Sequence, residues 1–192
     1  MGAAPSVKIL GIAGSLRKAS FNRAALRAAQ RLVPQGATLE IAEIGDLPPY
    51  NQDLEADLPP AVAEFKLRIR RADAILFVTA EYNYSVPGVL KNAIDWGTQP
   101  HGDNAWDGKP AAIMGASNSV LGSARAQYHL RQVLVAVNVH ALNRPEVLIG
   151  KAGEKFAQDG NLTDEPTVER IRQLLEALVQ WTRVLQRGRA DD

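Results

Sequence analysis

Cysteine is absent from the 192-residue chain, so disulfides, thiolate nucleophiles and cysteine-ligated metals are all excluded. Histidine is scarce: His101, His129 and His140 are the three present, and their spacing matches no metal-ligand pattern. Neither sign of charge is in excess, because 22 basic and 21 acidic residues leave a net charge of +1. This balance gives no electrostatic case for a nucleic-acid partner. We therefore predict no metal site and no nucleic-acid surface.

Long apolar runs are missing as well. No stretch reaches the length that spans a bilayer, and the first residues, MGAAP, carry no charged region of the kind that begins an export signal. We therefore expect a cytoplasmic protein without a membrane partner. The 46% of hydrophobic and 22% of charged residues are ordinary for a globular protein, and the length suits one domain over residues 1–192.

Apolar segments typical of buried strands alternate with amphipathic helical patterns along the chain. The expected strands cover residues 7–13, 37–44, 74–79, 110–116 and 138–143, and a further extended apolar piece covers 146–150. The expected helices cover residues 22–33, 61–71, 87–96, 123–137 and 166–187. Such alternation predicts an α/β fold with a doubly wound parallel sheet, and five strands favour the flavodoxin-like order 2-1-3-4-5. The ligand crevice of that arrangement lies at the carboxyl ends of strands one and three.

The loop after the first strand contains groups that suit a phosphate. Ser15 and Ser20 supply hydroxyls, Arg17 supplies a guanidinium and Asn22 supplies an amide. The helix that follows points free N–H groups and a partial positive charge at this loop. The spacing matches neither the lysine-containing nucleotide loop nor the G-x-G-x-x-G turn, which indicates a monophosphate held by side chains and amides. The alternative is an ordinary helix cap beside an unrelated arginine.

Two further polar loops are expected at the same edge of the sheet. The loop after the third strand begins at Glu81 and contains Tyr82 and Tyr84, whose rings can line a planar ligand. The loop after the fourth strand begins at Ser117 and offers small residues and peptide N–H groups. The set suits FMN rather than FAD, because Arg17 and the serines leave little room for an adenylate. The alternatives are tyrosines that only pack against long loops, and glycines that only form turns.

Two segments resemble the signatures of the NAD(P)H-dependent FMN reductases, a group that includes bacterial quinone, chromate and azo-dye reductases. They are GSLRKASFN at residues 14–22 and EYNYSVPGVLKNAIDW at residues 81–96, within a resemblance that runs from about Val7 to Glu146. The resemblance implies a flavodoxin-like fold, bound FMN and a homodimer or homotetramer. It also implies hydride transfer from NADPH or NADH through FMN to a small-molecule acceptor, such as a quinone, an azo dye, chromate, free flavin or a ferric complex.

The resemblance places the first segment at the FMN phosphate and the second along the flavin ring. With the fourth-strand loop added, the expected cofactor-binding residues are Gly14, Ser15, Arg17, Ser20, Phe21, Asn22, Glu81, Tyr82, Asn83, Tyr84, Ser117, Leu121 and Gly122. No side chain is expected to act as a general acid, because FMN carries the hydride transfer. Glu81 is expected to orient its neighbours.

The chain departs from the family pattern at two places. Ala80 replaces a proline before the second segment, and the fourth-strand loop carries Asn118, Ser119 and Val120 where the family has proline and glycines. Because side chains occupy positions that are usually open, we expect these three residues to shape the substrate mouth.

Two other functions share the fold. A flavodoxin-type electron carrier is usually strongly acidic and lacks an arginine equivalent to Arg17, so the net charge of +1 argues against it. A flavin-binding redox sensor stays open, because the fourth-strand loop is altered. The sequence contains no fingerprint that separates NADPH from NADH.

Three aromatic side chains, Trp96, Trp106 and Tyr128, exceed what the core of one small domain needs. Because aromatic residues are enriched at interfaces, we expect at least a dimer, with the two tryptophans near the partner subunit. A second interface through Arg125, Tyr128 and Glu146 would make a tetramer. The alternative is that the rings only cover the long loops at residues 45–60 and 97–109.

Overall fold

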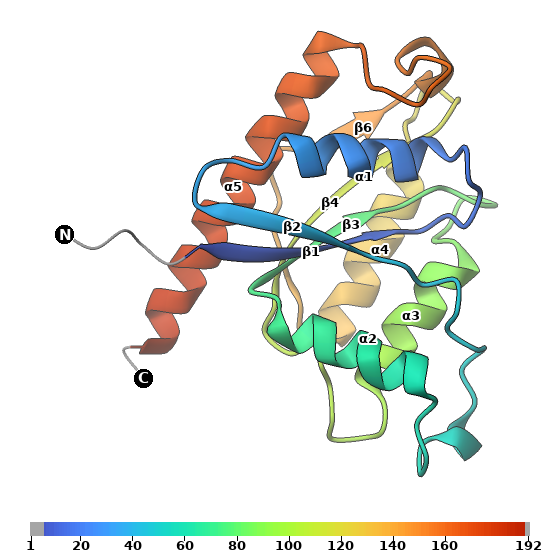
Figure 1. Cartoon of the computed structure of the whole chain (residues 1–192), viewed down its shortest axis with the longest axis vertical. Coiled ribbons are helices and arrows are strands. Elements are labelled where there is room, and N and C mark those ends of the chain that lie inside the picture. Colours follow the sequence, from blue (N-terminus) through green and yellow to red (C-terminus); the bar gives the residue numbers. More distant parts are fainter. Residues whose placement is uncertain (1–5, 191–192) are drawn as a thin grey trace.

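The computed structural model describes residues 6–190, which form a parallel sheet between two layers of helices (Figure 1). The strand order is β2-β1-β3-β4-β5, and β6 also pairs in parallel with β4. The strands are β1 Val7–Ala13, β2 Ala37–Ala42, β3 Ala74–Val78, β4 Pro110–Ala116, β5 His140–Ala141 and β6 Val147–Ile149. The predicted α/β fold and the order 2-1-3-4-5 are confirmed.

Five long helices cover the two faces of the sheet. They are α1 Phe21–Arg31, α2 Pro60–Arg71, α3 Gly88–Thr98, α4 Ala124–Ala136 and α5 Glu165–Ala190, with short 3-10 turns η1 Gln52–Leu54 and η2 Ala152–Glu154. Helices α1 and α5 lie on one face, and α2, α3 and α4 lie on the other (Figure 1). The sheet is therefore covered on both sides, as its apolar strands require.

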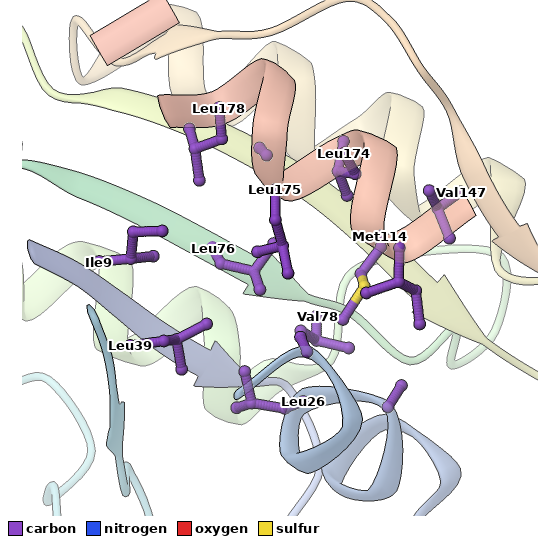
Figure 2. Close-up of a cluster of buried hydrophobic side chains, with 14 of the residues drawn as sticks. Ile9, Leu26, Leu39, Leu76, Val78, Met114, Val147, Leu174, Leu175 and Leu178 are labelled. Carbon is purple, nitrogen blue, oxygen red and sulfur yellow. The ribbon is translucent and has the colours of Figure 1, made fainter. Parts of the chain in front are cut away.

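The central strand β3 shows how the sheet divides the core. Every residue of β3 is buried, and alternate side chains face opposite helical layers. Leu76 and Val78 pack with α1 and α5, whereas Ile75 and Phe77 pack with the other three helices. Figure 2 shows the first of these clusters, in which Leu175 of α5 is directed at the sheet. Because helices bury both faces of β3, the strand is a continuous apolar run in the sequence.

Two short segments fill the place of the fifth strand, which the sequence predicts as one piece over residues 138–143. β5 pairs only with Pro110 and Ala111, whereas β6 pairs with Met114–Ala116, nearer the carboxyl end of β4. Pro145 lies between the two segments and has no N–H group to donate to the ladder, so the pairing breaks there. The piece expected only as extended backbone is thus the strand that pairs with the carboxyl end of β4.

The prediction that Trp96 and Trp106 exceed what the core of the domain needs is wrong. Both side chains are fully buried within the chain. The Trp106 ring packs against the Phe77 ring at 5.7 Å between centroids, and the Trp96 Nε1 donates a hydrogen bond to the Pro48 carbonyl at 2.7 Å. The long connections after β2 and α3 supply these contacts, so the indoles complete the core beneath the loops. Tyr128, in contrast, is exposed.

Residues 1–5, in which the sequence predicts no export signal, lie outside the described part of the chain. Between residues 6 and 190, no helix combines the length and the apolar character that a bilayer crossing requires.

Candidate functional site

The loops that follow β1, β3 and β4 meet at the carboxyl edge of the sheet, as the parallel topology requires. They enclose a cavity of about 180 Å³, which we call the edge cavity. Its lining consists of Ser15, Arg17, Ser20, Phe21, Asn22, Ala80, Glu81, Tyr82, Ala116, Ser117 and Asn118. The predicted site residues outside this lining are Gly14, Asn83, Tyr84, Ser119, Val120, Leu121 and Gly122. The structure therefore brings most of the predicted set together.

The β1–α1 loop presents a hydroxyl, a guanidinium and a helix N-terminus to the edge cavity. Ser20 caps α1, because its Oγ accepts hydrogen bonds from the N–H groups of Asn22 and Arg23 at 3.2 and 3.5 Å. The Arg17 guanidinium lies over the Phe21 ring, 5.9 Å from the centroid, and makes no ion pair with any residue from 6 to 190. A free guanidinium beside a helix N-terminus is suited to a phosphate.

Asn22 connects two of the loops. Its Nδ2 donates to the Ala116 carbonyl at 2.9 Å, and its Oδ1 accepts from the Ala116 N–H at 2.8 Å. Both ends of the amide are therefore engaged, and Asn22 fixes the start of α1 to the end of β4. Gly14 also has a packing role, because a Cβ at this position would lie 3.1 Å from the Leu90 Cδ2 of α3.

A tight turn places Tyr82 beside the first loop. The N–H groups of Tyr82 and Ser85 donate to each other's carbonyls at 3.1 and 3.0 Å, and Asn83 and Tyr84 between them have φ values of 50° and 68°. Two consecutive left-handed residues are the mark of a type I′ turn, and a tyrosine in this conformation is strained. The Tyr82 hydroxyl lies 3.3 Å from the Ser15 Oγ, so the turn closes over the β1–α1 loop.

Glu81 holds the start of α4 in place. Its Oε2 accepts from the N–H groups of Arg125 and Ala126 at 3.1 and 3.3 Å, and its Oε1 accepts from the Arg125 Nε at 2.5 Å. The carboxylate thus caps a helix whose N-cap residue, Ser123, forms no side-chain cap of its own. The Arg125 guanidinium also lies 3.6 Å above the Tyr84 ring. Both oxygens of Glu81 therefore position α4 and the turn.

The β4–α4 loop is built on serine hydroxyls and on the segment after β6. The Ser117 Oγ accepts from the Ser119 N–H at 3.0 Å, and the Ser119 Oγ accepts from the Leu121 N–H at 3.2 Å. The Asn118 Oδ1 accepts from the Gly153 N–H at 2.9 Å. Val120 is 75% exposed at the top of the loop. The loop therefore has a fixed base and an apolar tip.

Gly122 is required by packing at the base of this loop. It has a φ of 55°, and a Cβ at this position would lie 2.6 Å from the Leu148 carbonyl carbon. It therefore packs against the end of β6 and does not line the edge cavity. The sequence identified this glycine but did not identify its neighbour, because nothing in the pattern indicates that residues 147–149 pair with β4.

Sequence reasoning missed two contributors to the site. Arg125 was considered only as an interface residue, although it contacts both Glu81 and Tyr84. The segment from Lys151 to Gly153 supports the β4–α4 loop through backbone bonds, including one from the Lys151 N–H to the Ser119 carbonyl at 3.0 Å. Gly150 is the sequence signal that this segment approaches another backbone closely, because a Cβ there would lie 2.5 Å from the Val120 carbonyl oxygen.

The sequence profile of the NADPH-dependent FMN reductases matches residues 7–154. The chain belongs to this family. As a member of the FMN reductases it is 54% identical, over 181 residues, to an NAD(P)H-dependent FMN reductase of Pseudomonas aeruginosa, with 94% of this chain and 97% of the relative covered. It is 44% identical, over 174 residues, to a quinone reductase of Pseudomonas putida, with 90% and 93% covered.

A solved structure supports the same membership. FerB, a flavoenzyme NAD(P)H:(acceptor) oxidoreductase from Paracoccus denitrificans, is 42% identical to this FMN reductase family member and superposes with a TM-score of 0.86. The match covers 92% of this chain and 97% of FerB. The predicted resemblance, from about Val7 to Glu146, is therefore confirmed.

Proposed function

We propose that the chain forms one FMN-binding domain that catalyses the NAD(P)H-dependent reduction of quinones or similar small acceptors. The observation that carries the proposal is the edge cavity, where the unpaired Arg17 guanidinium, two buried serines and the start of α1 lie beside the Tyr82 turn. Membership of the FMN reductase family and the names of the relatives support it. FMN, when bound, supplies the two-electron transfer from NAD(P)H to the acceptor.

The donors of the edge cavity fit a monophosphate. The Arg17 guanidinium offers a planar fork, and the Ser20 hydroxyl hydrogen stays available because its oxygen alone caps α1. Ser15 is buried at the same end of the cavity. Arg17 is the single cation in the lining of the edge cavity, which matches the one phosphate of FMN. FMN is therefore the flavin that these residues suit.

The remaining residues orient a flat ring and admit an acceptor. The Tyr82 turn and the Ser117–Asn118 corner form the walls beyond the phosphate loop. Glu81 does not serve as an acid, because both of its oxygens are engaged by α4. Ser119 and Val120 belong to the β4–α4 loop but do not line the edge cavity. We therefore expect the size of their side chains to affect the entry of an acceptor more than the binding of the phosphate. The physiological acceptor can be a quinone, an azo dye, chromate, free flavin or a ferric complex.

We also infer that the working enzyme is a homodimer or a homotetramer. Several apolar side chains of the three loops that meet at the edge cavity stay uncovered within one chain: Leu16 is 44% exposed, Tyr82 51%, Val120 75% and Leu121 43%. Exposed apolar side chains on neighbouring loops are typical of a surface that a partner subunit covers. The predicted second interface through Arg125, Tyr128 and Glu146 is a separate expectation. Within one chain the Tyr128 hydroxyl donates to the Glu146 Oε1 at 3.0 Å, so these two side chains already bond to each other. The cytoplasmic location stays a prediction from sequence.

The visible spectrum of the purified protein tests the function. We expect flavin absorption that bleaches when NADPH is added under nitrogen and returns when a quinone is added. Chromatography of the released cofactor should identify FMN. A flavin that bleaches but is not reoxidised in repeated turnovers would favour the alternative, a flavin-binding electron carrier or redox sensor. Release of FAD, or the absence of any flavin after reconstitution, would overturn the proposal.

A further inference from the structure

A second, larger cavity lies on the other side of the β1–α1 loop. It measures about 610 Å³, and we call it the basic cavity. Its lining consists of Arg17, Lys18, Ala19, Ser20, Phe21, Ala24, Arg27, Gly153, Phe156, Ala157, Gln158, Asp159 and Gly160. Arg17, Ser20 and Phe21 line both this cavity and the edge cavity, so the two share a wall. The two cavities are therefore neighbours on the surface of the protein.

The charges of the basic cavity favour an anion. Arg17, Lys18 and Arg27 line it, and none of the three forms an ion pair with a residue from 6 to 190. Asp159 is the opposing carboxylate, but its Oδ1 accepts from the Asn161 N–H at 2.9 Å and its Oδ2 from the Asn161 Nδ2 at 2.7 Å. Asp159 is therefore held by Asn161, and Lys18 and Arg27 stay without an ion pair to residues 6–190 when Arg17 holds the FMN phosphate.

The floor of the basic cavity is apolar and aromatic. The rings of Phe21 and Phe156 lie 5.4 Å apart between centroids with an interplanar angle of 37°, and Ala24 and Ala157 extend the same surface. The two phenyl rings contact each other, so a ligand ring would pack on them rather than between them. An apolar aromatic surface beside unpaired cations suits a heteroaromatic ring that carries phosphate.

We propose that the basic cavity binds the adenosine half of NADPH and that Lys18 and Arg27 contact its 2′-phosphate. The inference rests on the proposed function, because the nicotinamide must reach the flavin while the adenosine lies elsewhere. The residues shared by the two linings place the basic cavity next to the edge cavity. Arginine is the usual partner of an adenosine 2′-phosphate, since its fork makes paired bonds to phosphate oxygens. NADH lacks this phosphate, so the basic cavity favours NADPH over NADH.

Titration calorimetry of the FMN-loaded protein with 2′,5′-ADP tests the binding directly. We expect 2′,5′-ADP to bind at least tenfold more tightly than 5′-AMP, and Arg27→Gln to remove about tenfold of that difference. Arg23→Gln is the matched control, because Arg23 lies one turn earlier on α1, pairs with Glu43 and does not line the basic cavity. Equal binding of the two nucleotides, or equal losses in the two variants, would overturn the inference.

Steady-state kinetics separate this inference from the proposed function. Arg27→Gln and Lys18→Gln should each raise the KM for NADPH about tenfold more than the KM for NADH. If the protein oxidises neither coenzyme but still prefers 2′,5′-ADP, the proposed function fails and the nucleotide site stands. If both KM values rise equally, or if Arg27→Gln instead loses FMN, the cation does not recognise the 2′-phosphate and the inference is wrong.

Discussion

Among single residues, Arg17 has the most direct predicted effect. Arg17→Ala should weaken FMN binding by about 1.5–3 kcal/mol, because one charge-assisted hydrogen bond to the phosphate is lost. Fluorescence titration of the apoprotein with FMN measures the change. Arg71→Ala is a control, since Arg71 is exposed at the end of α2 and does not line the edge cavity. An unchanged dissociation constant would place the phosphate elsewhere.

Residue types could be predicted from sequence more readily than residue partners. The Ser20 cap follows from a local rule, since a serine before an apolar helical pattern bonds the N–H groups just after it. Asn22 follows no such rule, because its partner Ala116 is 94 residues away along the chain. From the sequence we expect the Asn22 amide to lie near a phosphate. The structure shows that this amide bonds to Ala116 and so joins the start of α1 to the end of β4.

At the scale of elements, the β4–α4 loop separates acceptor choice from FMN binding. Val120→Ala should change the ratio of activities with bulky and small quinones, because the side chain is 75% exposed at the loop tip and outside the edge cavity. FMN affinity should stay within about tenfold, or 1.4 kcal/mol. Ratios measured with at least two acceptors of different size test this.

Val184→Ala is the control for that experiment, because Val184 is 52% exposed on α5 and contacts no part of the site. A fixed acceptor ratio with a large loss of FMN would assign the loop to cofactor binding instead. Ser119 is less suitable as a probe, since its hydroxyl supports the Leu121 N–H and its replacement would disturb the loop itself.

Periodicity predicted the helices and the long strands to within a few residues, but it did not predict how the last strand is divided. The apolar pattern of residues 138–143 is strand-like, yet only His140–Ala141 pair before Pro145 interrupts the ladder. Short strands depend on neighbours that are distant in sequence, and pattern alone carries no information about those neighbours.

For the whole molecule, acid stability should depend on Asp103. Burial alone would raise the pKa of Asp103, but hydrogen bonds from Lys66 and Arg70 and their charges outweigh it, so the pKa lies below its usual value of 3.8. A lowered pKa stabilises the fold above the unfolded-state pKa, and this contribution is lost as the pH falls through the folded-state pKa. The wild type should therefore lose stability below about pH 4.

Asp103→Asn should lower the free energy of unfolding at pH 7 by about 1–2 kcal/mol, allowing for a half-exposed carboxylate. The reason is Lys66, whose Nζ is buried and lies 2.9 Å from the Asp103 Oδ2. The variant's stability should also vary less with pH between about 2 and 5. Urea unfolding across that range, with the exposed Asp57→Asn as control, measures both effects. An identical pH profile in the variant and the wild type would contradict the prediction.

The mass of the active protein is the second prediction at this scale. Light scattering at micromolar concentration should give at least twice the chain mass of 20.8 kDa. The two tryptophans do not support this expectation, because they are buried within the chain. The exposed apolar side chains of Leu16, Tyr82, Val120 and Leu121 support it. A sample at 20.8 kDa that still turns over substrate would exclude the assembly.

The paired hydrogen bonds between Asn22 and Ala116 have a consequence for protein engineering. They fix the end of β4 to the start of α1, and Gly122 fixes the other end of the β4–α4 loop against β6. Residues 117–121 therefore form a cassette with two anchored ends. A library that exchanges this cassette among related reductases should leave the β1–α1 loop intact. The variants can then be compared by their activity with different acceptors.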